Sequence, residues 1–396
     1  MIKVFQHDRV KTKRTTMSMM IEFTICVALV FIAALVYYGV SGGDDAGKYI
    51  LRMFLNLLVS MGTVYAIETA NLAIRYHKTL KVKEIFLNPI TKEFFFATPL
   101  ILVLLFPVYT PIYVIFVSAL IASLVAKVIF GGFGSNIFNP ALAGRIFAGI
   151  CFSGQISNAS VVQAGTNLTI STGATLTTIN QASGFVNETL DISLKSLFLG
   201  TYHGAIGETF AGLIILIGIY LSVRKIIDWK MSLTYVVAFF IISLFMGVTA
   251  DKGLGSFEFA LRQCLYGAVL FGAVFCITDP VTSPVMSYGR IYAAFLGAFV
   301  CACIRYLGSA PEGVGYSILL VNLCTPAIDR ILSNKSNHRI GTQYIVMAGL
   351  TVMCIGLGCG IGAYLSGKMS FLNSVETILP FINGVFALSL IHIWRC

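Results

Sequence analysis

The chain has 396 residues, of which 57% are hydrophobic and only 11% are charged. Soluble domains carry about 25% charged residues, so this chain cannot cover a water-exposed surface, and we predict that it lies in a lipid bilayer. The net charge of +10 does not indicate a nucleic-acid partner, because excess Lys and Arg in a membrane protein mark its cytoplasmic loops. The 10 cysteines form no CxxC pair, and we interpret them as small buried hydrophobic residues rather than metal ligands.

Spanning helices are predicted where apolar stretches approach the roughly 20 residues that cross a bilayer. The run 94–130 is too long for one helix, and we expect Pro107 and Pro111 to break it into a hairpin. The third, fifth, eighth and tenth stretches are short or polar at their ends, which favours tilted, broken or half-inserted helices. The predicted spans are 21–40, 53–74, 94–107, 111–130, 137–153, 205–223, 231–249, 263–278, 291–307, 313–329 and 342–366.

The distribution of Lys and Arg predicts that the N-terminus is cytoplasmic. The basic clusters at 3–14, 75–92, 224–230 and 330–339 all fall on the inner side in that orientation. It leaves one large outer loop, about 154–204, in which Lys195 is the only Lys or Arg. A long polar segment of this kind is usually functional.

Two segments of the sequence resemble one another. Ile129–Phe147 and Leu270–Tyr292 each contain Phe-Gly-small, then Asn-Pro or Ser-Pro, then Gly-Arg-Ile-aromatic. They predict two five-span halves related by an axis along the membrane normal, with Pro and Gly breaking helices where backbone lines a cavity or ligand. A chance match of short Gly/Pro motifs stays open as the alternative.

We therefore predict an all-α polytopic membrane protein with about ten transmembrane helices in two five-span repeats with broken helices, plus one extra C-terminal span. The nine residues from Leu388 resemble a translated sequencing-library adapter, so we expect the natural reading frame to have been cut near Ala387. The predicted parts are a cytoplasmic N-terminus (1–20), a first repeat (21–153), an external loop (154–204), a second repeat (205–335), an extra span and tail (336–387) and the adapter-derived end (388–396).

Five motifs occur in an order that resembles one protein family: GGFGSNIFNPALAGRIF, HGAIGET, ITDPVTSP, PEG and NLCTPAIDR. The family comprises the D-type subunit of the Rnf ion-translocating electron-transport complex and the B-type subunit of the Na⁺-translocating NADH:quinone oxidoreductase (Nqr). DPVTSP followed by Gly289-Arg290 is more similar to the Rnf protein. The resemblance covers roughly residues 10–335.

This resemblance implies a multi-pass subunit of the bacterial inner membrane without free-standing activity. Its complex would pass electrons between ferredoxin and NAD and move Na⁺ or H⁺, and its partners would be the other complex subunits and a flavin transferase.

The outer loop contains STGATLTT (Ser171–Thr178), which resembles the family's flavinylation motif. The resemblance implies that Thr175 carries FMN through a phosphoester bond, with Thr172, Gly173 and Ala174 completing the recognition motif. Family members often have an acidic residue six positions before the acceptor, where this chain has Thr169. We also expect a second, non-covalent flavin (riboflavin) between the repeats, near the residues Asn139, Pro140 and Arg145.

Five carboxylates lie in or at the ends of predicted spans, where a charge costs a few kcal/mol unless it faces a cavity or a partner. We predict an ion pathway through them, and the alternative is that they form caps or salt bridges to Arg145, Arg290 or Arg305. The carboxylates are Asp279, Glu208, Asp329, Glu68 and Glu312. No catalytic residue is assigned, the five histidines do not cluster as metal ligands, and no nucleotide-binding motif is evident.

Two other functions remain open. One is a quinone-reducing protein of the second family branch, with Gly131-Gly132 near the quinone. The other is a small-solute transporter or channel without a redox role, since repeats with broken helices also describe such proteins. The STGAT motif distinguishes the redox subunit from a transporter or channel, because a transporter or channel does not need this motif.

Overall fold

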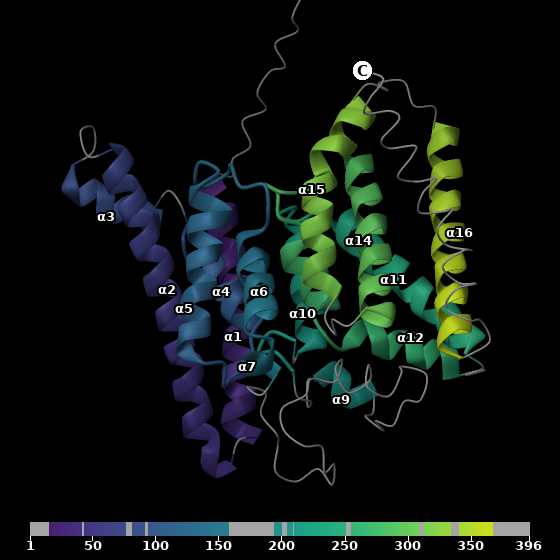
Figure 1. Cartoon of the computed structure of the whole chain (residues 1–396), viewed down its shortest axis with the longest axis horizontal. Helices are drawn as coiled ribbons and strands as arrows, with labels where there is room; N and C mark the ends of the chain where they lie inside the picture. Colours follow the sequence, from purple (N-terminus) through teal and green to yellow (C-terminus); the bar gives the residue numbers. More distant parts are fainter. Residues whose placement is uncertain are drawn as a thin grey trace, which may run out of the picture.

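The computed structural model of this chain is built from α-helices, with no strand in the part that it describes. Figure 1 shows α2, α4, α5 and α6 grouped on one side and α11, α12, α14, α15 and α16 on the other. The prediction of an all-α protein with several apolar helices is confirmed. The described residues are 16–41, 43–76, 81–91, 94–157, 194–199, 204–208, 210–250, 255–308, 313–333 and 340–366.

The first half of the chain contains two long helices and several short ones. Its elements are α1 (Thr16–Ser41), a 3-10 turn (Gly43–Asp45), α2 (Ala46–Tyr76), α3 (Val82–Thr91), α4 (Ala97–Leu104), α5 (Ile112–Leu120), a π-helix (Ile121–Val128), α6 (Pro140–Cys151) and α7 (Ser153–Ser157). Pro107 and Pro111 lie in the segment between α4 and α5, so the predicted break in the run 94–130 is confirmed. Helix α3 was not predicted, and it contains Pro89.

The second half repeats this mixture of long and interrupted helices. Its elements are α9 (Leu194–Leu199), α10 (Ala211–Val223), α11 (Trp229–Thr249), α12 (Gly255–Leu265), α13 (Val269–Phe271), a π-helix (Gly272–Cys276), α14 (Ser287–Leu307), α15 (Gly313–Ser333) and α16 (Ile340–Leu365).

Four helical stretches in the described part are long and apolar enough to cross a membrane: Thr16–Val40, Gly43–Arg75, Trp229–Thr249 and Ser287–Leu307. Helix α12 and the segment Val269–Cys276 form a further pair that is bent by 61°. Gly267, with φ +72°, lies at this bend, and its positive φ is a conformation that glycine adopts at no steric cost. The predicted span 263–278 is therefore interrupted, and the full count of spans stays a prediction.

The predicted span 205–223 differs from the structure at its start, because α10 begins only at Ala211. In the segment that precedes α10, two backbone N–H groups donate to carbonyls at or just beyond the end of α4. Ile206 N–H donates to the Phe106 carbonyl (3.1 Å), and Gly207 N–H donates to the Leu104 carbonyl (2.7 Å). These bonds hold the segment 205–208 against the end of α4, and α10 begins after it.

Each half contains a π-helix, then an irregular segment, then a helix with a Gly-Arg pair. In the first half α6 carries Arg145, and in the second α14 carries Arg290. Short π-helices are rare and often occur at functional sites. The irregular segments 129–139 and 277–286, which follow the two π-helices, are therefore candidates for a functional site. The two-repeat layout itself stays a prediction.

Candidate functional site

The two irregular segments meet at Asn139. Its side-chain oxygen accepts a hydrogen bond from Leu142 N–H (3.3 Å), and Pro140 occupies the first position of α6. An Asn cap followed by Pro is a favourable helix start, which explains why α6 begins at 140 rather than at the predicted 137. The amide nitrogen of Asn139 donates to the carbonyl of Cys276 at the end of the second π-helix (3.3 Å). One buried asparagine thus joins the two halves of the chain.

A cavity of about 400 Å³ lies beside this junction. Aromatic side chains form part of its wall, and polar groups from both halves face it, which is the usual composition of a cofactor or small-molecule site. Its polar lining includes Lys127, Asn136, Asn139, Thr278 and Asp279, and its aromatic lining is Phe23, Phe94, Phe133 and Phe275.

Of the three residues predicted to lie near a second flavin, the structure brings two to this cavity. Asn139 and Pro140 line it. Arg145 does not, because its Nε donates to the carbonyl of Leu105 (2.9 Å) and its guanidinium lies 5.0 Å from the centre of the Phe106 ring. Arg145 therefore holds the broken end of α4.

Glu68 forms a buried ion pair with Lys127. The Nζ atom of Lys127 lies 2.5 Å from Oε1 of Glu68, and the two side chains are 4% and 0% exposed. Lys127 also lies 5.5 Å from the centre of the Phe133 ring. Arginines were the predicted salt-bridge partners of the carboxylates, and Lys127 was not among them. A cation inside the predicted span 111–130 was the available signal, because such a charge needs a partner.

Asp279 lies half-buried in the loop 277–286, outside the spanning helices, and it lines the cavity. Its carboxylate accepts a hydrogen bond from Val281 N–H (3.1 Å). Burial raises the pKa of the Asp279 carboxyl to about 6, while hydrogen bonds from Val281 and Thr282 act in the opposite direction. Asp279 can therefore change protonation near neutral pH.

The other predicted ion-path residues have different surroundings. Glu208 is 4% exposed in the segment that bonds to the end of α4, and its Oε2 accepts from Ala205 N–H (3.4 Å). Asp329 of α15 accepts from Val285 N–H with both oxygens (3.1 and 3.2 Å), so it fixes the 277–286 loop to α15. Glu312 lies outside the described residues.

The predicted covalent flavin site also lies outside the described residues. Thr172, Gly173, Ala174 and Thr175 fall within 158–193, of which no structure is described. Gly131 and Gly132, the glycines considered for a quinone, follow the first π-helix with φ +122° and +98°. Across the described part of the chain no group of three His, Cys, Asp or Glu residues is arranged to hold a metal ion.

A family model described as NQR2, RnfD, RnfE matches residues 4–338. The chain belongs to this family.

Three relatives illustrate its range. The D-type subunit of the proton-translocating ferredoxin:NAD(+) oxidoreductase complex of Clostridium ljungdahlii is 34% identical over 239 residues, which cover 59% of this chain and 71% of that protein. The D-type subunit of the Na(+)-translocating complex of Acetobacterium woodii is 30% identical over 256 residues, 64% of this chain and 76% of that protein. The B-type subunit of the Na(+)-translocating NADH-quinone reductase of Ectopseudomonas mendocina is 30% identical over 252 residues, 62% of this chain and 61% of that protein.

The family assignment confirms the resemblance deduced from the motifs. Both predicted branches occur among the relatives, and all three relatives are named as subunits of ion-translocating oxidoreductases.

Proposed function

We propose that this chain is the D-type membrane subunit of an ion-translocating ferredoxin:NAD oxidoreductase complex, and that it relays electrons through FMN bound covalently to Thr175. The observation that carries the proposal is STGAT at 171–175 within a chain of this family. The threonine hydroxyl supplies the phosphoester oxygen, and Gly173 and Ala174 leave the backbone accessible to a flavin transferase. The chain has no free-standing activity and works with the other subunits of the complex.

A second, non-covalent flavin is proposed for the cavity at the junction of the two halves. Three features of the chain support this: the volume of about 400 Å³, the aromatic wall and the amides of Asn136 and Asn139 at its edge. Phe133 and Phe275 would contact the flat ring, and Lys127 and the amides would face its polar atoms. When bound, this flavin supplies one- and two-electron chemistry.

Ion translocation is proposed to involve the carboxylates Glu68, Glu208, Asp279, Asp329 and Glu312. Asp279 is the first candidate, because it faces the cavity and forms no ion pair in the described part of the chain. The coupling ion is Na⁺ or H⁺, and the two ferredoxin-linked relatives differ in this respect. The chain is assigned to the bacterial inner membrane with a cytoplasmic N-terminus.

The test is flavin fluorescence on a denaturing gel after co-expression with a flavin transferase. A fluorescent band in the wild-type chain that disappears in Thr175→Val supports the proposal. A wild-type band without fluorescence contradicts it and favours the transporter or channel alternative.

The quinone-reducing branch is the second candidate, because the relative from Ectopseudomonas mendocina is 30% identical. Both branches share the flavin threonine, so the denaturing gel does not separate them. Reconstituted complex distinguishes them by its electron partner: reduced ferredoxin with NAD supports the first assignment, and a quinone supports the second.

A further inference from the structure

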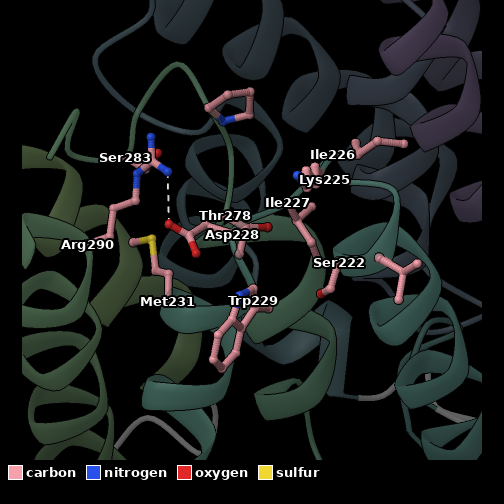
Figure 2. A pocket seen from close by; sticks show the side chains of 12 residues that line it. Ser222, Lys225, Ile226, Ile227, Asp228, Trp229, Met231, Thr278, Ser283 and Arg290 are labelled. Carbon is pink, nitrogen blue, oxygen red and sulfur yellow. Dashed lines mark hydrogen bonds and ion pairs between the residues drawn. The ribbon is translucent and has the colours of Figure 1, made fainter. Parts of the chain in front are cut away.

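A second cavity, which we term the α10–α11 pocket, lies where α10 ends and α11 begins. It has a volume of about 710 Å³ and is also lined by the loop 278–283 and the first turn of α14. Figure 2 shows Lys225 and Arg290 on opposite sides of Asp228. Two cations and one anion give the pocket an excess positive charge, and hydroxyl groups of Ser222, Thr278 and Ser283 also line it.

Lys225 occupies a backbone position that usually belongs to glycine. Its φ is +56°, and the N–H groups of Lys225 and Ile226 donate to the carbonyls of Ser222 (3.0 Å) and Leu221 (2.9 Å). These two bonds form the Schellman motif, in which this residue adopts the left-handed conformation. A side chain costs roughly 1–2 kcal/mol there, and such strain is concentrated at functional positions such as ligand clamps.

The cationic groups of the pocket keep hydrogen-bonding capacity for a ligand. Arg290 uses Nε for the carbonyl of Pro284 (2.8 Å) and Nη1 for Oδ2 of Asp228 (2.9 Å). In the described part of the chain, Nη2 of Arg290 and Nζ of Lys225 make no hydrogen bond or ion pair. Asp228 therefore orients Arg290 and leaves one side of the guanidinium available to an anion.

The surroundings of the pocket fit a lipid rather than a soluble anion. Trp229, at its rim, is 53% exposed, and Trp is enriched at membrane–water interfaces. Beyond the pocket, α10 packs mainly on α1, α9 and α13, whereas α11 packs mainly on α12, α14 and α16. Both present exposed aliphatic side chains, among them Leu216, Ile219, Leu233 and Val237.

We propose that the α10–α11 pocket binds the phosphate of an anionic phospholipid, with Lys225 and Arg290 as its cationic ligands and the acyl chains along the apolar surfaces of α10 and α11. Basic pockets between transmembrane helices bind such headgroups. The proposal does not depend on the flavin assignment.

Native mass spectrometry of the full-length chain in detergent tests this with phosphatidylglycerol and, for comparison, phosphatidylcholine with the same acyl chains. Wild-type protein should retain phosphatidylglycerol preferentially. Lys225→Gly should weaken that binding about five-fold, the effect of one cation near an anionic lipid. The variant should unfold at the same or a higher temperature in phosphatidylcholine, since glycine relieves the left-handed strain. Lys230→Gln is the matched control, because Lys230 is exposed next to the pocket but does not line it.

Four outcomes overturn the proposal. Equal retention of the two lipids excludes headgroup recognition, and an equal loss in Lys230→Gln indicates diffuse charge rather than a site. Displacement of phosphatidylglycerol by equimolar inorganic phosphate indicates a site for the free anion. If Lys225 in the assembled complex stays protected from an amine reagent after lipid removal, the pocket is a contact with another protein of the complex.

Discussion

Lys127 and Glu68 are 59 residues apart in the sequence, and their side chains pair at 2.5 Å with almost no exposure. The pair connects α2 to the first π-helix, whose last turn leads into the loop that lines the cavity. Its two possible roles, structural support and ion binding, have different experimental consequences.

Single substitutions at this pair should destabilise the protein. Glu68→Gln or Lys127→Met leaves one buried charge without its partner, which typically costs 3–5 kcal/mol. Thermal unfolding in detergent should show a large fall for each single variant and a smaller one for the combined Glu68→Leu/Lys127→Met. If the stable double variant also keeps its ion-dependent turnover, Glu68 is structural and is removed from the ion pathway.

Thr175→Val should abolish covalent flavin while leaving membrane insertion normal, because it removes one hydroxyl group from the outer loop. Thr172→Ala should reduce modification without abolishing it, since that hydroxyl belongs to the recognition motif and not to the bond. In-gel fluorescence and the mass of the tryptic peptide, which gains FMN less water, measure both. Fluorescence that survives Thr175→Val would rule out this attachment site.

Asp279→Asn should raise the ion concentration needed for turnover and leave Thr175 flavinylated. The wild-type carboxyl, with its pKa raised to about 6, is charged above that pH and becomes protonated as the pH falls through it. Ion-dependent turnover of the wild-type complex should therefore decline between pH 7 and pH 5, and this dependence should be absent from the residual activity of Asp279→Asn. Asp45→Asn, at an exposed pair with Lys48, is the control. Identical pH profiles for wild type and Asp279→Asn would exclude Asp279.

Gly144→Ala should displace α6 and weaken binding of the second flavin. A Cβ atom at Gly144 would lie 2.4 Å from the carbonyl oxygen of Ser118 in α5, and such overpacking costs about 1–3 kcal/mol. Gly62→Ala is the matched control, because no atom lies within 4 Å of a Cβ there and alanine favours a helix by about 1 kcal/mol. Released flavin and unfolding temperature are the measurements. Equal flavin content in both variants would argue against a site at the start of α6.

A cysteine at Ser183 should react with a membrane-impermeant maleimide in intact cells, because the loop 154–204 is predicted to lie outside. Cys151, which is exposed at the end of α6, must first be changed to serine to remove its background reaction. Labelling that occurs only after permeabilisation would reverse the orientation.

The sequence predicted the helices best where hydrophobic length or proline decides the structure. α11 was expected at 231–249 and occurs at Trp229–Thr249, and the break between α4 and α5 follows from Pro107 and Pro111. The late start of α10 could not be predicted, because the segment before it is held by backbone bonds to Leu104 and Phe106 in another part of the chain. Short-range periodicity contains no information about such long-range bonds.

The candidate site, like the helices, could be predicted from the sequence only in part. Motif order identified the family. Asn139 and Pro140 line one cavity, and their place beside a second flavin stays a prediction. Arg145 was grouped with them, but its contact with Leu105 depends on how α4 ends. The flavin threonine lies outside the described residues and stays a prediction from the motif.

The C-terminal ends of the two π-helices differ in the groups that meet their carbonyls. The C-terminal end of a helix carries a partial negative charge of roughly half an electron from its unpaired carbonyls. At the first π-helix a cation meets this charge, because Arg75 Nη2 donates to the carbonyl of Val128 (3.2 Å). At the second, the neutral amide of Asn139 donates to the carbonyl of Cys276 (3.3 Å), and no cation donates to it in the described part of the chain. The partial negative charge of the second helix end is therefore not offset by a bonded cation, and it lies in the same half of the chain as the carboxylate of Asp279.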